Sequence, residues 1–345
     1  MNEIITPVLA KLVRRTDIDA DEIEAAFGEV LAGRASDIEA AGFAIALRTK
    51  GETVTELAAM VRTMLRFATI IDVPDGAIDT CGTGGDRAGT INVSTIAALI
   101  AAGAGARVVK HGNRAASSQC GSADVLEALG IPVELGPAGV ERCVAEVGLG
   151  FCLAQRYHPA LRFMGPARRE LGVPTTFNFL GPLANPARVR RQAVGVSDPT
   201  MAERVIAVLE ANGTEHAWVF HGDDGLDELT TTATSTVYEL RDGATRKFSV
   251  DPLDLGIPRA EKRDLAGGDS TTNADAVRAV LDGKPGAVRD IALLNAAAAL
   301  VVAGRADDLA GGLELARGSI DSGAAARVLD DWIRVAAAAL AAEAS

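Results

Sequence analysis

A glycine-dense stretch, DTCGTGGDRAGTINVST, is the part of the sequence whose residue types point most directly to chemistry. It spans Asp79–Thr95, between a short apolar run and an apolar helical pattern. Glycines let backbone N–H groups approach an anion closely, and the start of a helix adds unpaired N–H groups and the positive end of its dipole. The stretch therefore predicts a phosphate-binding loop. A tight strand-to-helix turn without a ligand is the alternative.

The spacing of this loop differs from two better-known phosphate-binding motifs. For GxGxxG, Gly82 and Gly84 fit, but Arg87 stands at the third glycine position. For the Walker motif, Gly84 and Gly89 fit, but Thr90 stands where the lysine must be. The density of Ser, Thr and Asn after the glycines still favours a ligand over an empty turn.

A second polar stretch, KHGNRAASSQCGSAD, spans Lys110–Asp124. It follows a predicted strand, so Lys110 lies at the carboxyl end of that strand, where open α/β sheets bind ligands. A lysine, an arginine and several serines can hold phosphate oxygens by charge and hydrogen bonding. The alternative is a polar loop that only caps the helix beginning at Asp124. We expect that cap as well, but it does not account for residues 110–118.

A third stretch, FHGDDGLDE, places four carboxylates within six residues: Asp223, Asp224, Asp227 and Glu228. It directly follows a predicted strand. Carboxylates at this density repel one another unless a cation joins them. A hard divalent ion such as Mg²⁺, shared between carboxylates and substrate phosphates, fits that requirement. A solvated acidic turn is the alternative, because acidic loops are common in acidic proteins.

Short apolar runs alternate with helical patterns after Pro74, and these elements must position the three polar stretches. The runs predicted as strands are Ala77–Thr80, Arg107–Lys110, Gly150–Ala154, Gln192–Val196, Ala217–His221 and Thr236–Leu240. Helical patterns lie between most of them, one beginning at the N-cap and proline pair Asp198-Pro199. Such alternation is typical of an α/β domain with a mostly parallel central sheet.

The first 70 residues carry only helical patterns, with capping boxes at Ser36–Glu39 and Thr53–Glu56. Short amphipathic helices bury little by themselves, so we expect their apolar faces to meet another domain or a second subunit. We therefore predict a helical domain at residues 1–72, which forms a homodimer, and an α/β domain at 73–345. The proline-rich segment from about 163 to 190 predicts an ordered functional insertion whose helices join the helical domain.

Composition excludes several classes of protein. The 345 residues are 48% hydrophobic and 23% charged, an ordinary globular balance. No run of 18 apolar residues lacks a charge, and we expect no membrane span. A net charge of −12 is expected to repel nucleic acid. Four cysteines without CxxC spacing and a beginning without a signal-peptide pattern favour a cytoplasmic protein.

Seven segments, in order, resemble the anthranilate phosphoribosyltransferase family of tryptophan biosynthesis: GTGGD, NVST, KHGNRAASS, GSADVLEALG, RRELG, FNFLGPLANPA and HGDDGLDE. The resemblance runs from about Asp79 to Glu228. It implies a small helical domain, a larger α/β domain of nucleoside phosphorylase and phosphoribosyltransferase type, and a homodimer formed through the helical domain. It also implies transfer of the 5-phosphoribosyl group of phosphoribosyl pyrophosphate (PRPP) to anthranilate, with release of pyrophosphate, and a requirement for Mg²⁺, with two ions per active site.

The resemblance assigns roles residue by residue. The positions that match PRPP contacts are Gly82, Gly85, Asp86, Thr90, Asn92, Val93, Ser94, Thr95, Lys110, His111, Gly112, Asn113, Arg114, Ala115, Ala116, Ser117, Ser118 and Ser122. Those that match anthranilate contacts are Gly82, His111, Asn113 and Arg168, with Arg168 placed to meet the substrate carboxylate. Those that match Mg²⁺ ligands are Ser94, Asp227 and Glu228. Lys110, Asn113 and Arg168 are expected to be catalytic through charge and orientation, without a covalent nucleophile.

One position departs from the family pattern. Gln119 and Cys120 stand in SSQCG where the family usually has SSKSG, and we expect the missing lysine to weaken pyrophosphate binding modestly. Three alternatives stay open: the same transfer to another aromatic acceptor, a pyrimidine nucleoside phosphorylase, and a catalytically silent relative that binds nucleic acid. The phosphorylases carry Lys-His-Ser before their Thr-Gly-Gly loop, whereas residues 79–82 read DTCG. Contact with an anthranilate synthase subunit also stays open.

Overall fold

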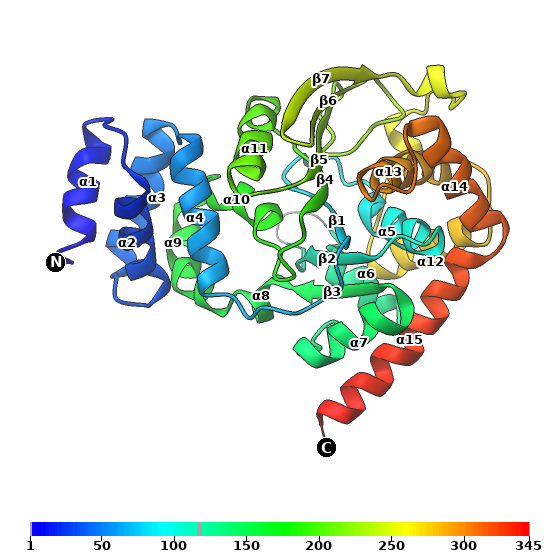
Figure 1. Cartoon of the computed structure of the whole chain (residues 1–345), viewed down its shortest axis with the longest axis horizontal. Coiled ribbons are helices and arrows are strands. Elements are labelled where there is room, and N and C mark those ends of the chain that lie inside the picture. The colour runs from blue at the N-terminus through cyan, green and yellow to red at the C-terminus, as the bar shows by residue number, and fades with distance from the viewer. Residues whose placement is uncertain (1, 116–118, 345) are drawn as a thin grey trace.

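A helical bundle forms one end of the molecule. The structure is a computed structural model that describes residues 2–115 and 119–344. The bundle comprises α1 (Ile5–Val13), α2 (Ala20–Leu31), α3 (Asp37–Lys50) and α4 (Val54–Arg66) (Figure 1). Both predicted capping boxes are confirmed, the first opening α3 and the second opening α4.

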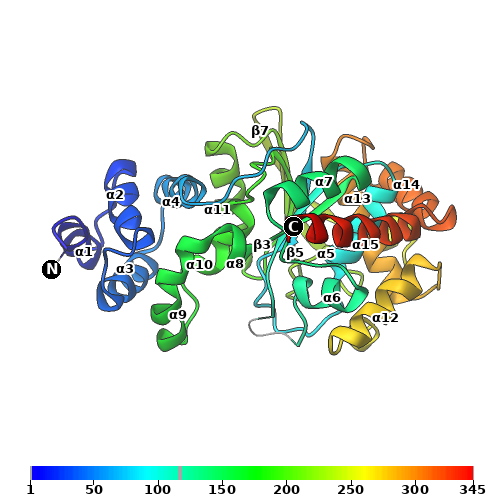
Figure 2. The ribbon, with the colours of Figure 1, turned by 90° about the horizontal axis from the view of Figure 1, so that it is seen from below.

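A segment from the middle of the chain packs against this bundle. It contains α8 (Ala154–Tyr157), the 3₁₀ helix η1 (Pro159–Met164), α9 (Gly165–Leu171), α10 (Phe177–Leu180) and the 3₁₀ helix η2 (Gly181–Leu183). Helix η1 contacts α2, α9 contacts α3, and α10 contacts α4 (Figure 2). The proline-rich insertion is therefore ordered and lies on the bundle, whereas the residue boundary between the two domains stays a prediction.

The sheet of the α/β part has the strand order β3-β2-β1-β4-β5-β6-β7. Its strands are β1 (Ile78–Gly82), β2 (Val108–Gly112), β3 (Leu149–Leu153), β4 (Arg191–Gly195), β5 (His216–Gly222), β6 (Ser235–Arg241) and β7 (Ala244–Val250). Strands β1 to β5 are parallel, and β6 and β7 pair antiparallel at one edge. The six predicted strands are confirmed to within two residues. Strand β7 escaped prediction because its exposed, charged side chains, which suit a sheet edge, mask the alternation.

Helices cover both faces of the sheet. Helix α11 (Pro199–Ala211) lies on the side of the bundle, and Asp198 caps it as predicted. The opposite side carries α5 (Val93–Gly103), α13 (Ala287–Val302), α14 (Leu309–Asp321) and α15 (Ala324–Glu343) (Figure 1). The remaining elements are α6 (Ser122–Leu129), α7 (Pro137–Val147), η3 (Pro252–Leu255), η4 (Lys262–Leu265) and α12 (Ser270–Leu281).

Two hydrophobic clusters lie on opposite faces of the sheet. Neighbouring residues of one strand alternate between them, as the pleat of a strand requires: Val194 and Val219 belong to one cluster, Ala193 and Trp218 to the other. The first cluster continues through α11 into the helical bundle, where it includes Phe27. The bundle therefore shares its core with one face of the sheet.

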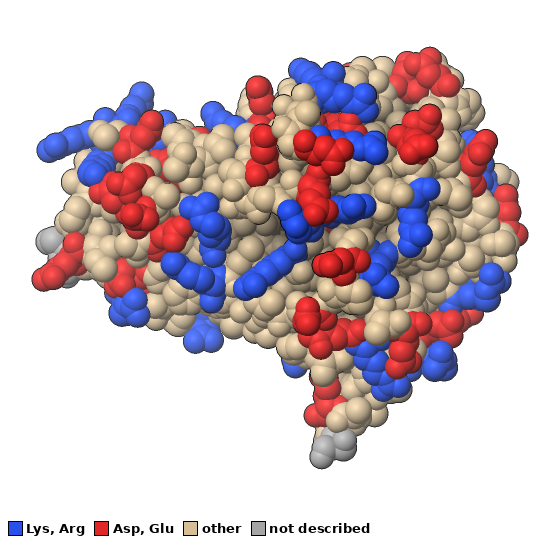
Figure 3. Space-filling view, in the orientation of Figure 1, with Lys and Arg blue, Asp and Glu red and all other residues tan. Residues whose placement is uncertain are grey.

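The surface seen in Figure 3 carries acidic and basic side chains interspersed over the face in view. In the described part of the chain, no helix combines the length and the apolar character that crossing a membrane requires.

Candidate active site

Two glycines bring the acidic loop (residues 223–228) directly over the ends of two strands. Gly82 of β1 pairs with Gly195 of β4, at the point where the strand order changes direction and open α/β sheets bind ligands. A Cβ added to Gly82 would lie 2.2 Å from Asp227 Oδ2, and one added to Gly195 would lie 1.7 Å from the backbone oxygen of Asp227. Only glycine at both positions leaves room for this approach.

The glycine loop (residues 83–92) contacts the acidic loop through its first half. The N–H of Gly84 donates to Asp227 Oδ2 at 2.7 Å, and Ser197 Oγ donates to the backbone oxygen of Gly84 at 2.8 Å. Gly84 and Gly85 have φ of +68° and +86°, left-handed values that glycine adopts without strain. The loop thus reaches Asp227 through the backbone N–H of Gly84 and is held in place by Ser197.

The second half of the glycine loop is held by a distant segment that sequence reasoning missed. Ile91 N–H donates to the oxygen of Leu265 at 3.0 Å, and Gly267 N–H donates to the oxygen of Gly89 at 2.8 Å. Asn273, which is buried, donates from Nδ2 to Asn92 Oδ1 at 2.8 Å. These partners lie more than 170 positions along the chain, so no local pattern marks them.

The predicted residues of the first stretch lie together between the end of β1 and the first turn of α5. They are Gly82, Gly85, Asp86, Thr90, Asn92, Val93, Ser94 and Thr95. Lys110, from the neighbouring strand β2, is buried beneath them: its Nζ donates to the oxygen of Thr80 at 2.6 Å and to Ser94 Oγ at 2.9 Å. Its charge therefore acts from below the loop, and its direct contact with PRPP stays a prediction.

His111 is buried, neutral and has one free ring nitrogen. Burial, with a further contribution from His158, lowers the pKa of His111 to about 3. Its Nδ1 lies 3.0 Å from the oxygen of Gly181, and since a carbonyl only accepts, Nδ1 carries the proton. Its Nε2 is buried without a hydrogen-bond partner among the described residues. The ring therefore presents an acceptor.

The polar loop after β2 folds back on the start of α6. Asp124 Oδ2 accepts from the N–H groups of Ala115 and Gly121, at 2.9 and 2.8 Å, which is the cap that the sequence predicts. Arg114 binds Glu127 through both terminal nitrogens, so its guanidinium supports the loop. Gly112, Asn113 and Ser122 also lie in this part of the chain, and Asn113 is exposed. Ala116, Ser117 and Ser118 lie outside the described residues.

The acidic stretch divides into two pairs. Asp223 and Asp224 shape the turn: Asp224 accepts from Thr230 Oγ1 at 2.8 Å, and Asp223 accepts from Thr234. Asp227 and Glu228 are buried and face the glycine loop and Lys110. Only the second pair is therefore placed to serve a ligand.

The chemistry of this second pair fits a divalent cation. Burial and the neighbouring Asp86 raise the pKa of Asp227 to about 7. Burial and Asp227 also raise the pKa of Glu228, which the charge of Lys110 partly offsets. Among the described residues, no three His, Cys, Asp or Glu side chains are spaced to hold a metal unaided. Mg²⁺ commonly binds through one or two carboxylates together with substrate phosphates, and these carboxylates suit such a shared ion.

Arg168 lies on α9, on the bundle side of the site. Its side chain is exposed and makes no hydrogen bond or ion pair with any described residue. A planar guanidinium without a partner is well suited to bind a carboxylate through two parallel hydrogen bonds. The predicted acceptor contacts thus come from two parts of the fold, Arg168 from the bundle side and His111 with Asn113 from the sheet.

Asp79 and Asn185 form a buried link that sequence reasoning also missed. Asp79 Oδ2 accepts from Asn185 Nδ2 at 2.8 Å, and its Oδ1 accepts from the N–H of His111 at 3.3 Å. Asn185 belongs to the FNFLGPLANPA segment. The resemblance of that segment to the family pattern was the one feature of the sequence that could have pointed to Asn185. The link joins that segment to the strand that carries Lys110 and His111.

Comparisons with known proteins agree with this geometry. The family model described as "Glycosyl transferase family, a/b domain" matches residues 75–326, and "Glycosyl transferase family, helical bundle domain" matches residues 6–68. Anthranilate phosphoribosyltransferase of Nocardioides sp. strain JS614 is 56% identical over 335 residues, which cover 96% of this chain and 98% of that protein.

Two solved structures extend the similarity to the fold. The enzyme of that name from Thermus thermophilus has a TM-score of 0.91 at 38% identity, covering 95% of this chain and 98% of the other. The one from Saccharomyces cerevisiae, in complex with PRPP and Mg, has a TM-score of 0.90 at 25% identity, covering 98% and 99%. The chain therefore belongs to the anthranilate phosphoribosyltransferase family.

Proposed function

We propose that the protein transfers the 5-phosphoribosyl group of PRPP to the amine of anthranilate, releasing pyrophosphate, in a reaction that depends on Mg²⁺. The observation that carries this proposal is the meeting of a glycine loop, a buried lysine and two buried carboxylates at one strand-order reversal. The yeast relative with PRPP and Mg supports the same choice of substrate and ion.

The protein's part in the first half of the reaction is to stabilise charge. Loss of pyrophosphate builds negative charge on the leaving group. The N–H groups of the glycine loop and of the start of α5 would bind its oxygens, and Lys110 adds a positive charge directly beneath Ser94. Asp227 and Glu228, with Ser94, would hold Mg²⁺, for which we propose two ions per site. Mg²⁺ neutralises negative charge on the phosphate oxygens when bound.

The protein's part in the second half is to orient a weak nucleophile. Arg168, which has no described partner, would bind the carboxylate of anthranilate. His111, neutral and with a free Nε2 acceptor, would lie beside the aromatic amine together with the exposed Asn113. Holding the amine in line with the reacting carbon supplies a large part of the rate when the nucleophile itself is weak.

We also propose that the helical bundle forms a homodimer. Three of its large apolar side chains are exposed. Ile4, just before α1, is 42% exposed, Val13 at the end of α1 is 76% exposed, and Ile38 on α3 is 84% exposed. A second copy is the simplest cover for such a surface. The four cysteines are buried and form no disulfide with one another, which suits the cytoplasmic location that we propose.

The decisive experiment follows anthranilate fluorescence and pyrophosphate release in parallel, with enzyme, Mg²⁺ and PRPP. We expect both signals to change together and to stop on addition of EDTA or in the double variant Asp227→Ala and Glu228→Ala. Pyrophosphate release with another aromatic amine, but not with anthranilate, would show that the transferase uses that amine as its acceptor substrate. If folded protein changes neither anthranilate fluorescence nor pyrophosphate release, the proposed transferase activity is refuted.

A further inference from the structure

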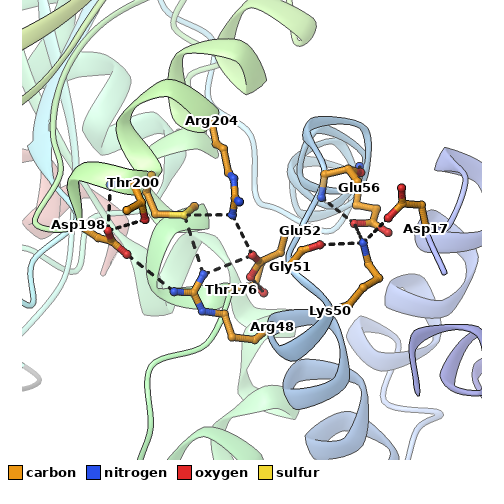
Figure 4. Close-up of polar contacts among 12 residues, drawn as sticks. Asp17, Arg48, Lys50, Gly51, Glu52, Glu56, Thr176, Asp198, Thr200 and Arg204 are labelled. Carbon is orange, nitrogen blue, oxygen red and sulfur yellow. Dashed lines mark hydrogen bonds and ion pairs between the residues drawn. The ribbon is translucent and has the colours of Figure 1, made fainter. Parts of the chain in front are cut away.

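Glu52 is a buried carboxylate at the junction of the helical bundle and the α/β part. It lies in the turn between α3 and α4, and its side chain is 0% exposed. Thr176 Oγ1 donates to Glu52 Oε1 at 2.6 Å. Two guanidinium groups approach Oε2, that of Arg48 at 3.3 Å and that of Arg204 at 3.7 Å (Figure 4).

The partners of Glu52 come from three separate elements. Arg48 belongs to α3 of the bundle, Arg204 to α11 on the sheet, and Thr176 to the turn before α10. Arg48 also lies 3.8 Å from the carboxylate of Asp198, the N-cap of α11. One buried carboxylate thus connects the bundle, the insertion and the α/β part.

Thr176 lies between two groups of the proposed acceptor site. It is fully buried, one short loop after α9, which carries Arg168. It is followed by the single turn of α10 and then by Gly181, whose oxygen accepts from His111 Nδ1 at 3.0 Å. A shift of Thr176 would therefore move the helix of Arg168 and the hydrogen-bond acceptor of His111 relative to each other.

We propose that Glu52 is a positioning residue for the acceptor substrate: by fixing Thr176 between the bundle and α11, it sets the distance between Arg168 and His111. This inference rests on the proposed function. The described residues expected to bind PRPP lie between β1 and the start of α6, and none of them is among the residues that contact the Glu52 carboxylate, which are Thr176, Arg48 and Arg204. Loss of the Glu52 contacts should therefore weaken binding of the acceptor substrate far more than binding of PRPP.

Glu56 provides a matched control in the same turn of the chain. Its side chain is also 0% exposed and pairs with a buried lysine, Lys50, at 3.0 Å. Its carboxylate also accepts from the N–H groups of Thr53 and Ile18, which lie within the bundle. Glu56 is thus as buried as Glu52 and as dependent on a charged partner, but it does not reach the α/β part.

The experiment compares Glu52→Gln, Thr176→Val and Glu56→Gln with the wild type. For the first two we expect the KM for anthranilate to rise by about tenfold, because Arg168 and His111 would no longer be held at one separation, while the KM for PRPP changes less than about twofold. For Glu56→Gln we expect both KM values to stay within about twofold of the wild type, even where its melting temperature falls. Hydrogen exchange of residues 175–183 in the free protein should accelerate in Glu52→Gln and Thr176→Val only.

Equal rises of both KM values in Glu52→Gln, or the same selective rise in Glu56→Gln, would overturn the inference. Should Glu52→Gln fail to fold, Thr176→Val decides, because it removes one hydroxyl and leaves the ion pairs in place. Absence of transfer by the wild type would refute the proposed function alone. In that case, exchange rates at residues 175–183 that are unchanged in Thr176→Val would also refute the positioning role.

Discussion

Replacing Gly195 by alanine is expected to displace the loop that carries Asp227 and Glu228. The added Cβ would lie 1.7 Å from the backbone oxygen of Asp227 and 2.4 Å from its carbonyl carbon, whereas real Cβ contacts are essentially never shorter than 3.0 Å. Strand β4 and the acidic loop must therefore separate by about 1.3 Å, the difference between the shortest of these distances and that limit. Because the obstacle is backbone, no side-chain rotation can relieve it.

A displacement of this size should affect activity more than stability. Misplacing reacting or metal-binding groups by about 1 Å can cost about a hundredfold in rate, and we expect a loss of that order in kcat/KM. The Mg²⁺ concentration for half-maximal activity should rise as well. Overpacking of this kind typically costs about 1–3 kcal/mol of unfolding free energy, so the variant should still fold. The assay is anthranilate fluorescence over a Mg²⁺ titration, with thermal melting in parallel.

Gly318→Ala is the matched control, because a Cβ there meets no atom within 4 Å. Gly318 lies inside α14, where alanine is favoured over glycine by about 0.5–1 kcal/mol. It should melt slightly higher and keep wild-type kinetics. Wild-type activity and Mg²⁺ response in Gly195→Ala would refute the reasoning, since the acidic loop would then tolerate the separation.

Three further predictions test individual residues. Burial raises the pKa of Asp79 from 3.8 to about 6, so the folded protein binds the carboxyl proton of Asp79 more tightly than the unfolded chain does. The contribution of this proton to the free energy of unfolding is therefore lost as the pH rises from about 4 to about 6. In urea unfolding, the free energy of unfolding of the wild type should decline by up to about 1.4 kcal/mol per pH unit in this window, whereas that of Asp79→Asn should not. The His111 ring, whose pKa burial lowers to about 3, should show no NMR titration between pH 5 and 8. Gln119→Lys should lower the KM for PRPP by about two- to fivefold, more strongly at low ionic strength.

Each of these has a plain contrary outcome. Parallel stability curves for Asp79→Asn and the wild type would show that the buried carboxyl does not hold a proton in this range. A His111 resonance that titrates near neutral pH would contradict its burial and the tautomer inferred from Gly181. An unchanged KM in Gln119→Lys would show that the charge missing from this position has no effect on PRPP.

Much of the fold could be predicted from the sequence because it is encoded locally. Apolar runs of four or five residues mark β1 to β6, and serine or threonine three residues before glutamate marks the starts of α3 and α4. Strand β7 has no such signal, since five of its seven residues are exposed and its charges suit an edge. Local patterns therefore reveal buried strands far better than exposed ones.

The site was predictable in its loops but not in its partners. The residue types of the glycine loop and of Asp227 with Glu228 indicate phosphate and metal chemistry, and strand ends bring them together. Which side chains of those stretches face inward depends on tertiary contacts. Lys110 donates a hydrogen bond to Ser94, and Arg114 donates to Glu127. Asn273, which is distant in the sequence, donates to Asn92 of the glycine loop. None of these choices is visible in spacing.

The shared core of the bundle and the sheet bears on how the molecule folds and how it can be dissected. The two family models meet between residues 68 and 75, yet one hydrophobic cluster crosses that line and includes Phe27, Val194 and Val219. A fragment lacking the first 72 residues would expose the apolar face of α11 and the sheet to water. We expect such a fragment to aggregate, and the whole chain to unfold in a single transition. The boundary between the two family models is thus not a boundary of the hydrophobic core, and we expect the entire chain to be the unit of stability.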